Sequence, residues 1–128
     1  MPTIDELLQV GRDVQRELWP PGAGRERGRS PAARLAPDFF EHVAATAFGD
    51  LWSRPGLARR DRCLVTVAQL AALGHREQLR AHLVGARNGG LSVEELVEVL
   101  IHTSIYAGVP AAVEALAVAA EVFGVSDP

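Results

Sequence analysis

The chain has 128 residues and a net charge of −3, and 48% of its residues are hydrophobic while 5% are aromatic. This length suits one domain with a hydrophobic core, which we expect to span residues 1–128. The negative charge argues against a nucleic-acid partner, and no apolar run reaches the ~18 residues of a membrane span. The acidic start lacks the basic-then-apolar pattern of a signal peptide, so a cytoplasmic location is the expectation.

Several kinds of chemistry are excluded by residues and motifs that the sequence lacks. All 13 basic residues are arginine, so no lysine is available for a Schiff base. Neither a GxGxxG motif nor a P-loop occurs, and this gives no support to a dinucleotide or nucleotide site. Cys63 is the single cysteine, so there is no disulfide and no CxxC redox pair. We expect Cys63 to be a buried, unreactive thiol.

The apolar periodicity in the first half of the chain predicts three helices. They cover residues 3–18, 37–51 and 57–73, and the third is apolar on nearly every side after Arg62. A helix that is apolar all round is a buried one, so we expect it at the centre of the fold. Residues 19–34 are rich in Pro, Gly and Arg, and this composition predicts a loop. The loop is interpreted as a surface connector, with an arginine flap over an anionic ligand as the alternative.

The second half predicts three more helices. Gly74 ends the third helix, and the fourth runs from about residue 75 to residue 88. Ser92 and Glu95 form a capping box that begins a helix ending near residue 107, and Pro110 suits the first turn of a last helix through residue 123. With no strand alternation anywhere, the prediction is an all-α bundle of about six helices. The alanine- and valine-rich final helices give a thin core, and we therefore expect a homo-oligomer.

The stretch GHREQLRAHLVGARNGG, residues 74–90, carries an unusual polar stripe. On a helix, His75, Gln78 and His82 fall within about 60° of one another. Histidine suits proton transfer near neutral pH, so the stripe is a candidate acid–base site. A solvated helix face explains the periodicity equally well. A metal site lacks HExxH spacing and a completing carboxylate or cysteine, so we expect no metal.

Two further polar groups stand out. His102 and Tyr106 lie one helical turn apart in an apolar segment, where a satisfied core group is the simpler interpretation. Trp52 and Arg54 come just before Pro55, and an arginine held by a following proline suits a bidentate carboxylate clamp. A surface salt bridge is the alternative for Arg54.

Four segments, FGDLWSRPGL, RRDRCLVTVAQLAALG, LRAHLVGARNGG and EVLIHTSIYAGVPAAVEA, resemble the γ-carboxymuconolactone decarboxylases in order and spacing. The resemblance covers about residues 36–123. It implies an all-α fold shared with the alkylhydroperoxidase D group, a homo-oligomer (trimer or hexamer) with sites near subunit contacts, and no metal or organic cofactor. It also implies decarboxylation of a small lactone dicarboxylate in aromatic-ring catabolism. The peroxidase branch has a CxxC pair where this chain has His75 and Gln78, so thiol peroxidase chemistry is not implied.

The resemblance assigns proton transfer to His82, with Gln78 and His75 beside it as further catalytic candidates. The candidates for binding an anionic small-molecule substrate are Trp52, Arg54, Arg80, Arg87, Asn88, His102 and Tyr106. The chain departs from the family's typical residues at three positions: Gln78 replaces a glutamate, and Gly89 and Val113 each replace an asparagine.

Three functions are therefore compatible with the sequence. The first is a cofactor-independent decarboxylase of a small cyclic carbon acid of the 4-carboxymuconolactone type. The second is an enzyme of the same fold that decarboxylates, cyclises or isomerises a polycyclic or polyketide-derived substrate in specialised metabolism. The third is a ligand-binding oligomer without catalysis.

Overall fold

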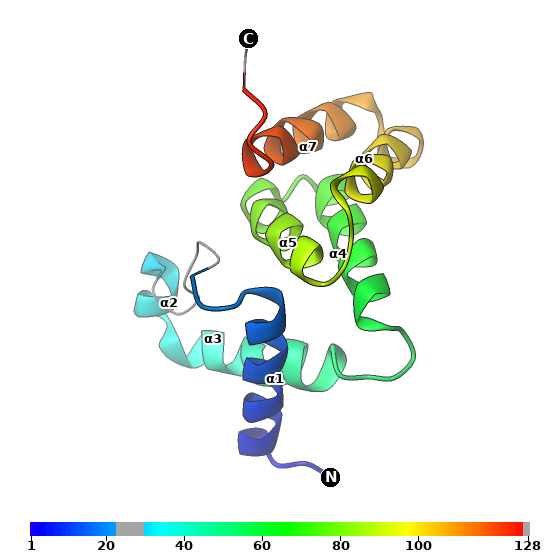
Figure 1. Cartoon of the computed structure of the whole chain (residues 1–128). Coiled ribbons are helices and arrows are strands. Elements are labelled where there is room, and N and C mark those ends of the chain that lie inside the picture. Colours follow the sequence, from blue (N-terminus) through cyan, green and yellow to red (C-terminus); the bar gives the residue numbers. More distant parts are fainter. Residues whose placement is uncertain (23–29, 127–128) are drawn as a thin grey trace. The chain divides into compact units, whose positions relative to one another are not determined.

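The computed structural model describes residues 1–22 and 30–126, and every regular element in these ranges is a helix (Figure 1). The elements are α1 (Ile4–Leu18), α2 (Pro31–Leu35), α3 (Pro37–Val43), the π-helix η1 (Ala44–Leu51), α4 (Arg59–Leu73), α5 (Arg76–Asn88), α6 (Val93–Ala107) and α7 (Val109–Val122). The all-α prediction is confirmed. The contacts divide the chain into two compact units, Met1–Ala58 and Arg59–Pro128. A single domain across residues 1–128 stays a prediction.

The first unit is built on a close crossing of α1 and η1. A Cβ atom added at Gly11 would lie 1.8 Å from the carbonyl oxygen of Ala44, and one added at Gly49 would lie 2.0 Å from the carbonyl oxygen of Leu7. The two helices therefore touch backbone to backbone at both glycines. No other residue type fits at these positions without separating the helices.

Aromatic rings fill the space beside this crossing. Trp19 meets Phe48 edge to face, with ring centroids 5.8 Å apart. Phe48 stacks on Trp52 at 5.6 Å and an interplanar angle of 27°. Val14 and Leu18 of α1 are also buried. Trp52 is thus a core side chain of the first unit.

The prediction of a loop over residues 19–34 is wrong for the last residues of that range. Ser30 accepts a hydrogen bond from the backbone of Ala33 at 3.1 Å, and Pro31 occupies the first turn of α2. A serine N-cap followed by proline begins a helix even where no large apolar residue is present. Residues 23–29, which include most of the proposed arginine flap, lie outside the described residues.

The predicted helix at residues 37–51 is present, but it changes character at Ala44. Residues 44–51 adopt the wider π-helical turn, which is rare in proteins and is not visible in apolar periodicity. The Ser53 hydroxyl donates to the Gly49 carbonyl at 2.5 Å, just after the last π-helical turn.

In the second unit, α4 packs against α5, α6 and α7, which confirms its central position. Its buried residues are Cys63, Val67 and Ala71. The expected burial on every side is wrong, because Val65 is 39% exposed and Leu73 is 68% exposed. The three neighbouring helices cover one side of α4 and leave the other uncovered within the unit.

The predicted helix boundaries in this unit are confirmed. Gly74 adopts a φ of 73° directly after α4, a conformation that suits glycine. The Ser92 hydroxyl accepts from the Glu95 backbone at 3.0 Å, and the Glu95 carboxylate accepts from the Ser92 backbone at 3.1 Å. Glu95 also forms an ion pair with Arg60, so the same side chain caps α6 and connects it to α4. In the described ranges, no helix is long and apolar enough to cross a membrane.

The α1–η1 crossing generates a stability prediction. Gly11→Ala places a methyl group against the backbone of Ala44, and we expect a loss of at least ~1–3 kcal/mol in the free energy of unfolding. Gly56→Ala is the matched control, because nothing lies within 4 Å of a Cβ at Gly56. Urea unfolding at one fixed protein concentration measures both variants. Equal stability of the two would contradict the close crossing.

Cys63 generates a second prediction. Burial raises the pKa of its thiol, and the nearby charge of Arg59 lowers that pKa by less. Only the thiolate is nucleophilic, so the native thiol should react slowly at neutral pH. We expect a thiol-specific disulfide reagent to label Cys63 far more slowly in the native protein than in urea. Native labelling at the unfolded rate would show that the side chain is accessible.

Candidate functional site

The orientation of α5 is set by the side chains that it buries. Leu79 and Leu83 are 1% and 0% exposed, and Ala86 is also buried. They face α4 and α7, the two helices against which α5 packs. Because a helix turns by about 100° per residue, the polar residues of α5 are divided between the two flanks of this buried face.

The stripe of His75, Gln78 and His82 occupies one flank. His75 directly precedes α5, and its side chain makes no capping hydrogen bond. His75 and Gln78 are exposed, whereas His82 is half-buried. The solvent exposure of the stripe therefore decreases from His75 to His82. A half-buried imidazole of this kind is shielded from solvent on one side and accessible on the other.

Two candidate carboxylate-binding arginines of α5 already have acceptors within the unit. The Arg80 guanidinium donates to Glu121 of α7 at 2.5 Å and lies 3.7 Å from Glu77. The hydrogen bond to Glu121 is the main cause that raises the pKa of Arg80 above its ordinary value. Arg87 donates to the backbone carbonyl of Leu91 at 3.1 Å. A substrate carboxylate at either arginine would compete with these contacts.

The remaining candidates lie on separate elements. Arg54 is exposed in the first unit, where its backbone amide donates to Leu51 at 3.1 Å. Asn88 is exposed at the last residue of α5. Substrate-binding roles for these residues, and for the buried Trp52, stay predictions.

His102 and Tyr106 form a ring pair on α6, with centroids 5.1 Å apart and an interplanar angle of 31°. Both residues are exposed. The interpretation of these residues as satisfied core groups is therefore wrong, because the apolar segment around them is itself partly uncovered. Neighbouring Ile105 is 79% exposed and Tyr106 is 81% exposed. A pair of polar rings on an uncovered helix end is available to a ligand or to another chain.

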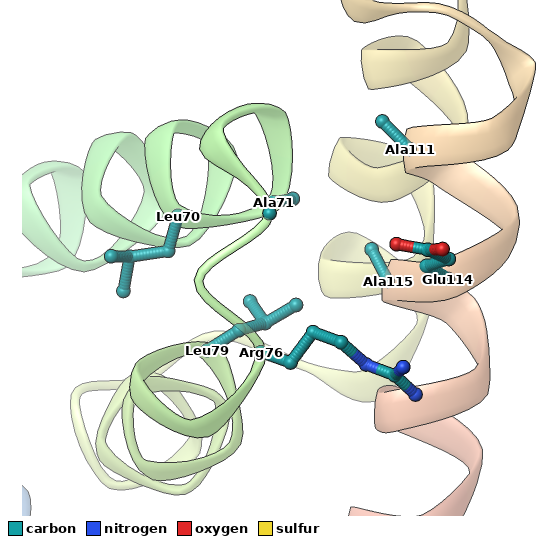
Figure 2. Close-up of a pocket in the computed structure, with 8 residues that line it drawn as sticks. Leu70, Ala71, Arg76, Leu79, Ala111, Glu114 and Ala115 are labelled. Carbon is teal, nitrogen blue, oxygen red and sulfur yellow. The ribbon is translucent and has the colours of Figure 1, made fainter.

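A shallow hollow lies on the opposite flank of α5 (Figure 2). It is a shallow depression that is open to solvent, and it is lined by Leu70, Ala71, Gly74, Arg76, Leu79, Ala111, Glu114 and Ala115. Figure 2 shows Arg76 extending from the start of α5 towards α7, which carries Glu114. Neither Arg76 nor Glu114 was predicted from the sequence as a site residue.

One signal for Arg76 was present in the sequence. Arg76 and Arg80 lie one turn apart on α5, so they share a flank. Nothing in the sequence indicated that α7 would face this flank. In the described parts of the chain, no three His, Cys, Asp or Glu side chains gather closely enough to hold a metal ion.

Residues 37–121 match the model of the carboxymuconolactone decarboxylase family. A 4-carboxymuconolactone decarboxylase from Acinetobacter baylyi is 48% identical over 86 residues, which are 67% of this chain and 64% of that enzyme. The match thus spans just under two thirds of that relative's length.

Two further relatives cover more of the chain. A nitrosuccinic acid decarboxylase from Metarhizium robertsii is 31% identical over 115 residues, or 90% of this chain and 77% of that enzyme. An uncharacterized 15.0 kDa protein from Paracoccus denitrificans is 27% identical over 97% of this chain and 92% of its own length. Because the family model matches about two thirds of the residues, this chain belongs to the carboxymuconolactone decarboxylase family.

Proposed function

We propose that the protein is a cofactor-independent decarboxylase of a small cyclic anionic carbon acid of the 4-carboxymuconolactone type. The observation that carries the proposal is the 48% identity to an enzyme named for that reaction. The stripe on α5 supports it, because the helix holds two imidazoles and an amide along one flank.

In the proposed reaction, the bond between the ring carbon and the substrate carboxylate breaks. Its electron pair passes into the conjugated lactone carbonyl, so carbon dioxide leaves and a dienolate remains. The substrate itself is thus the electron sink, and the protein supplies hydrogen bonds to the developing negative charge. His82 in its protonated form then donates one proton to the ring carbon, and solvent restores that proton.

The partners of His82 in this proposal are Gln78 and His75. Gln78 lies about one turn before His82 and offers amide donors that suit a dienolate oxygen or a carboxylate. His75 lies two turns before His82, at the exposed start of the stripe. Asn88 is the proposed carboxylate contact on α5. Arg80 and Arg87 lie on the flank of α5 opposite to His82, so a small acid at His82 does not reach them within one chain. His102 and Tyr106 of α6 are the proposed walls of the pocket.

A second candidate keeps the fold and changes the substrate to an acid of specialised metabolism. It is favoured by the relative from Metarhizium robertsii, whose name gives nitrosuccinic acid as its substrate. The departures at Gln78, Gly89 and Val113 favour the same candidate, because each removes a polar or charged side chain that the family typically has.

We also propose that the chain assembles as a homo-oligomer, a trimer or hexamer. The end of α6 and the start of α7 carry large apolar residues without cover: Ile101, Ile105, Tyr106, Val109 and Val113. An uncovered apolar patch of this kind marks an interaction surface in soluble proteins. A second copy of the chain packed on this patch would contact the His102–Tyr106 pair. The subunit contact would in this way complete a site.

The role of His82 generates a prediction. His82→Ala should lower kcat by roughly 10²–10⁴, the usual contribution of a positioned acid–base group. His42→Ala is the matched control, because His42 is exposed on α3 of the first unit and has no part in the proposal. Turnover is followed by loss of substrate absorbance for carboxymuconolactone and by carbon dioxide release for nitrosuccinate.

The pattern of outcomes separates the candidates. Turnover of carboxymuconolactone supports the first candidate, and turnover of nitrosuccinate alone supports the second. Full activity of His82→Ala would remove His82 from the mechanism. A folded wild-type oligomer that turns over neither acid would contradict the proposed reaction on both substrates.

The proposed assembly predicts the mass of the particle in solution. A single chain has a mass of 13.7 kDa, so light scattering at micromolar concentration should give three or six times this value. Val113→Arg should reduce the mass, because it places a charge within the uncovered apolar patch. A monomeric mass for the wild-type protein would contradict the assembly.

A further inference from the structure

Two side chains of opposite charge line one hollow of the second unit without forming an ion pair with each other. Arg76 of α5 and Glu114 of α7 both line the hollow. Both side chains are exposed, and neither forms an ion pair with another described residue. The charged atoms of the two residues therefore do not approach each other to ion-pair distance.

The same two helices, α5 and α7, form an ion pair one turn further along α5. Arg80, one turn after Arg76 on α5, donates to Glu121 of α7 at 2.5 Å. The contact between α5 and α7 is thus able to bring arginine and glutamate together. At Arg76 and Glu114 the helices leave a gap instead, and the hollow occupies that gap (Figure 2).

The rest of the lining is apolar. Leu70, Ala71 and Leu79 come from α4 and α5, and Ala111 and Ala115 come from α7. These side chains offer no hydrogen bonds, so Arg76 and Glu114 supply the polar recognition. A guanidinium binds a carboxylate with two parallel hydrogen bonds, while a carboxylate accepts from a hydroxyl or an ammonium group.

We propose that this hollow binds a small carboxylic acid that also carries a hydroxyl or ammonium donor, with Arg76 holding its carboxylate and Glu114 its donor. The hollow is shallow and open to solvent, so the ligand is a compact molecule, such as a 2-hydroxy acid or an amino acid, that keeps most of its surface in water. Glu114 disfavours a ligand with a second carboxylate at the same place, because the like charges repel. The site is distinct from the stripe of His75, Gln78 and His82, which lies on the other flank of α5.

The test measures binding directly and needs no turnover, so its outcome is independent of the proposed reaction. Protein with methyl-labelled alanine is titrated with glycolate, glycine and acetate, and the methyl signals of Ala71, Ala111 and Ala115 are followed by NMR. We expect saturable shifts at these alanines, with tighter binding of glycolate and glycine than of acetate.

Three variants make the result specific. Arg76→Gln should weaken binding of all three acids by about tenfold or more, because it removes the charge-assisted hydrogen bonds. Glu114→Gln should weaken binding of glycine and leave that of acetate equal or stronger, because it removes a negative charge. Arg34→Gln, an exposed arginine on α2 of the first unit, is the control and should change nothing.

Three results would overturn the proposal. The first is the absence of saturable shifts at the hollow with any of the acids. The second is undiminished binding by Arg76→Gln. The third is a shift of the same alanine signals with protein concentration alone, which would assign the hollow to a contact between copies of the chain.

Discussion

The burial of Leu79 and Leu83 against α4 and α7 is the constraint on which the chemistry of the second unit depends. Each of these side chains contributes roughly 1.5–3 kcal/mol by leaving water, so α5 has one stable rotation about its axis. That rotation assigns every polar residue of the helix to a flank. His75, Gln78 and His82 fall on one side of the buried face, and Arg76 and Arg80 fall on the other. A different set of buried residues would mix the imidazoles with the arginines, and neither flank would then have a single chemical character.

The charges on the arginine flank differ in how they are used. Arg80 is held by Glu121 and Glu77, so it acts first as a connection between α5 and α7. Both partners are exposed enough that such a pair contributes little to stability, but it does fix the rotamer of the arginine. Arg87 is likewise turned towards the Leu91 carbonyl. Binding of a carboxylate at Arg80 or Arg87 would therefore require an exchange of partners, whereas Arg76 needs none.

Local signals in the sequence were sufficient for most of the fold. In the second unit, α6 begins at the Ser92–Glu95 capping box, α7 begins near Pro110, and helices end at glycine, all as predicted. These signals are readable from the sequence because they act within one helical turn. The short α2 was not predicted, because the composition around it is typical of a loop, although Ser30 and Pro31 carry the signal of a helix start. The π-helix at residues 44–51 and the hollow at Arg76 were not predictable in this way. The first has no distinct apolar period, and the second depends on which helix packs beside α5.

Gln78 is the residue of the stripe that departs from the family's typical glutamate. Decarboxylation needs an electron sink and one proton, and in the proposed reaction the lactone carbonyl and His82 provide them. A carboxylate at position 78 is therefore not required by the balance of the reaction. Its replacement by an amide removes a negative charge from the flank that would receive an anionic substrate, and it adds two hydrogen-bond donors. The change consequently favours carboxylate binding near His82 while it ends any proton relay through position 78. Gln78 is thus compatible with decarboxylation, and its main effect in this proposal is on which acid binds.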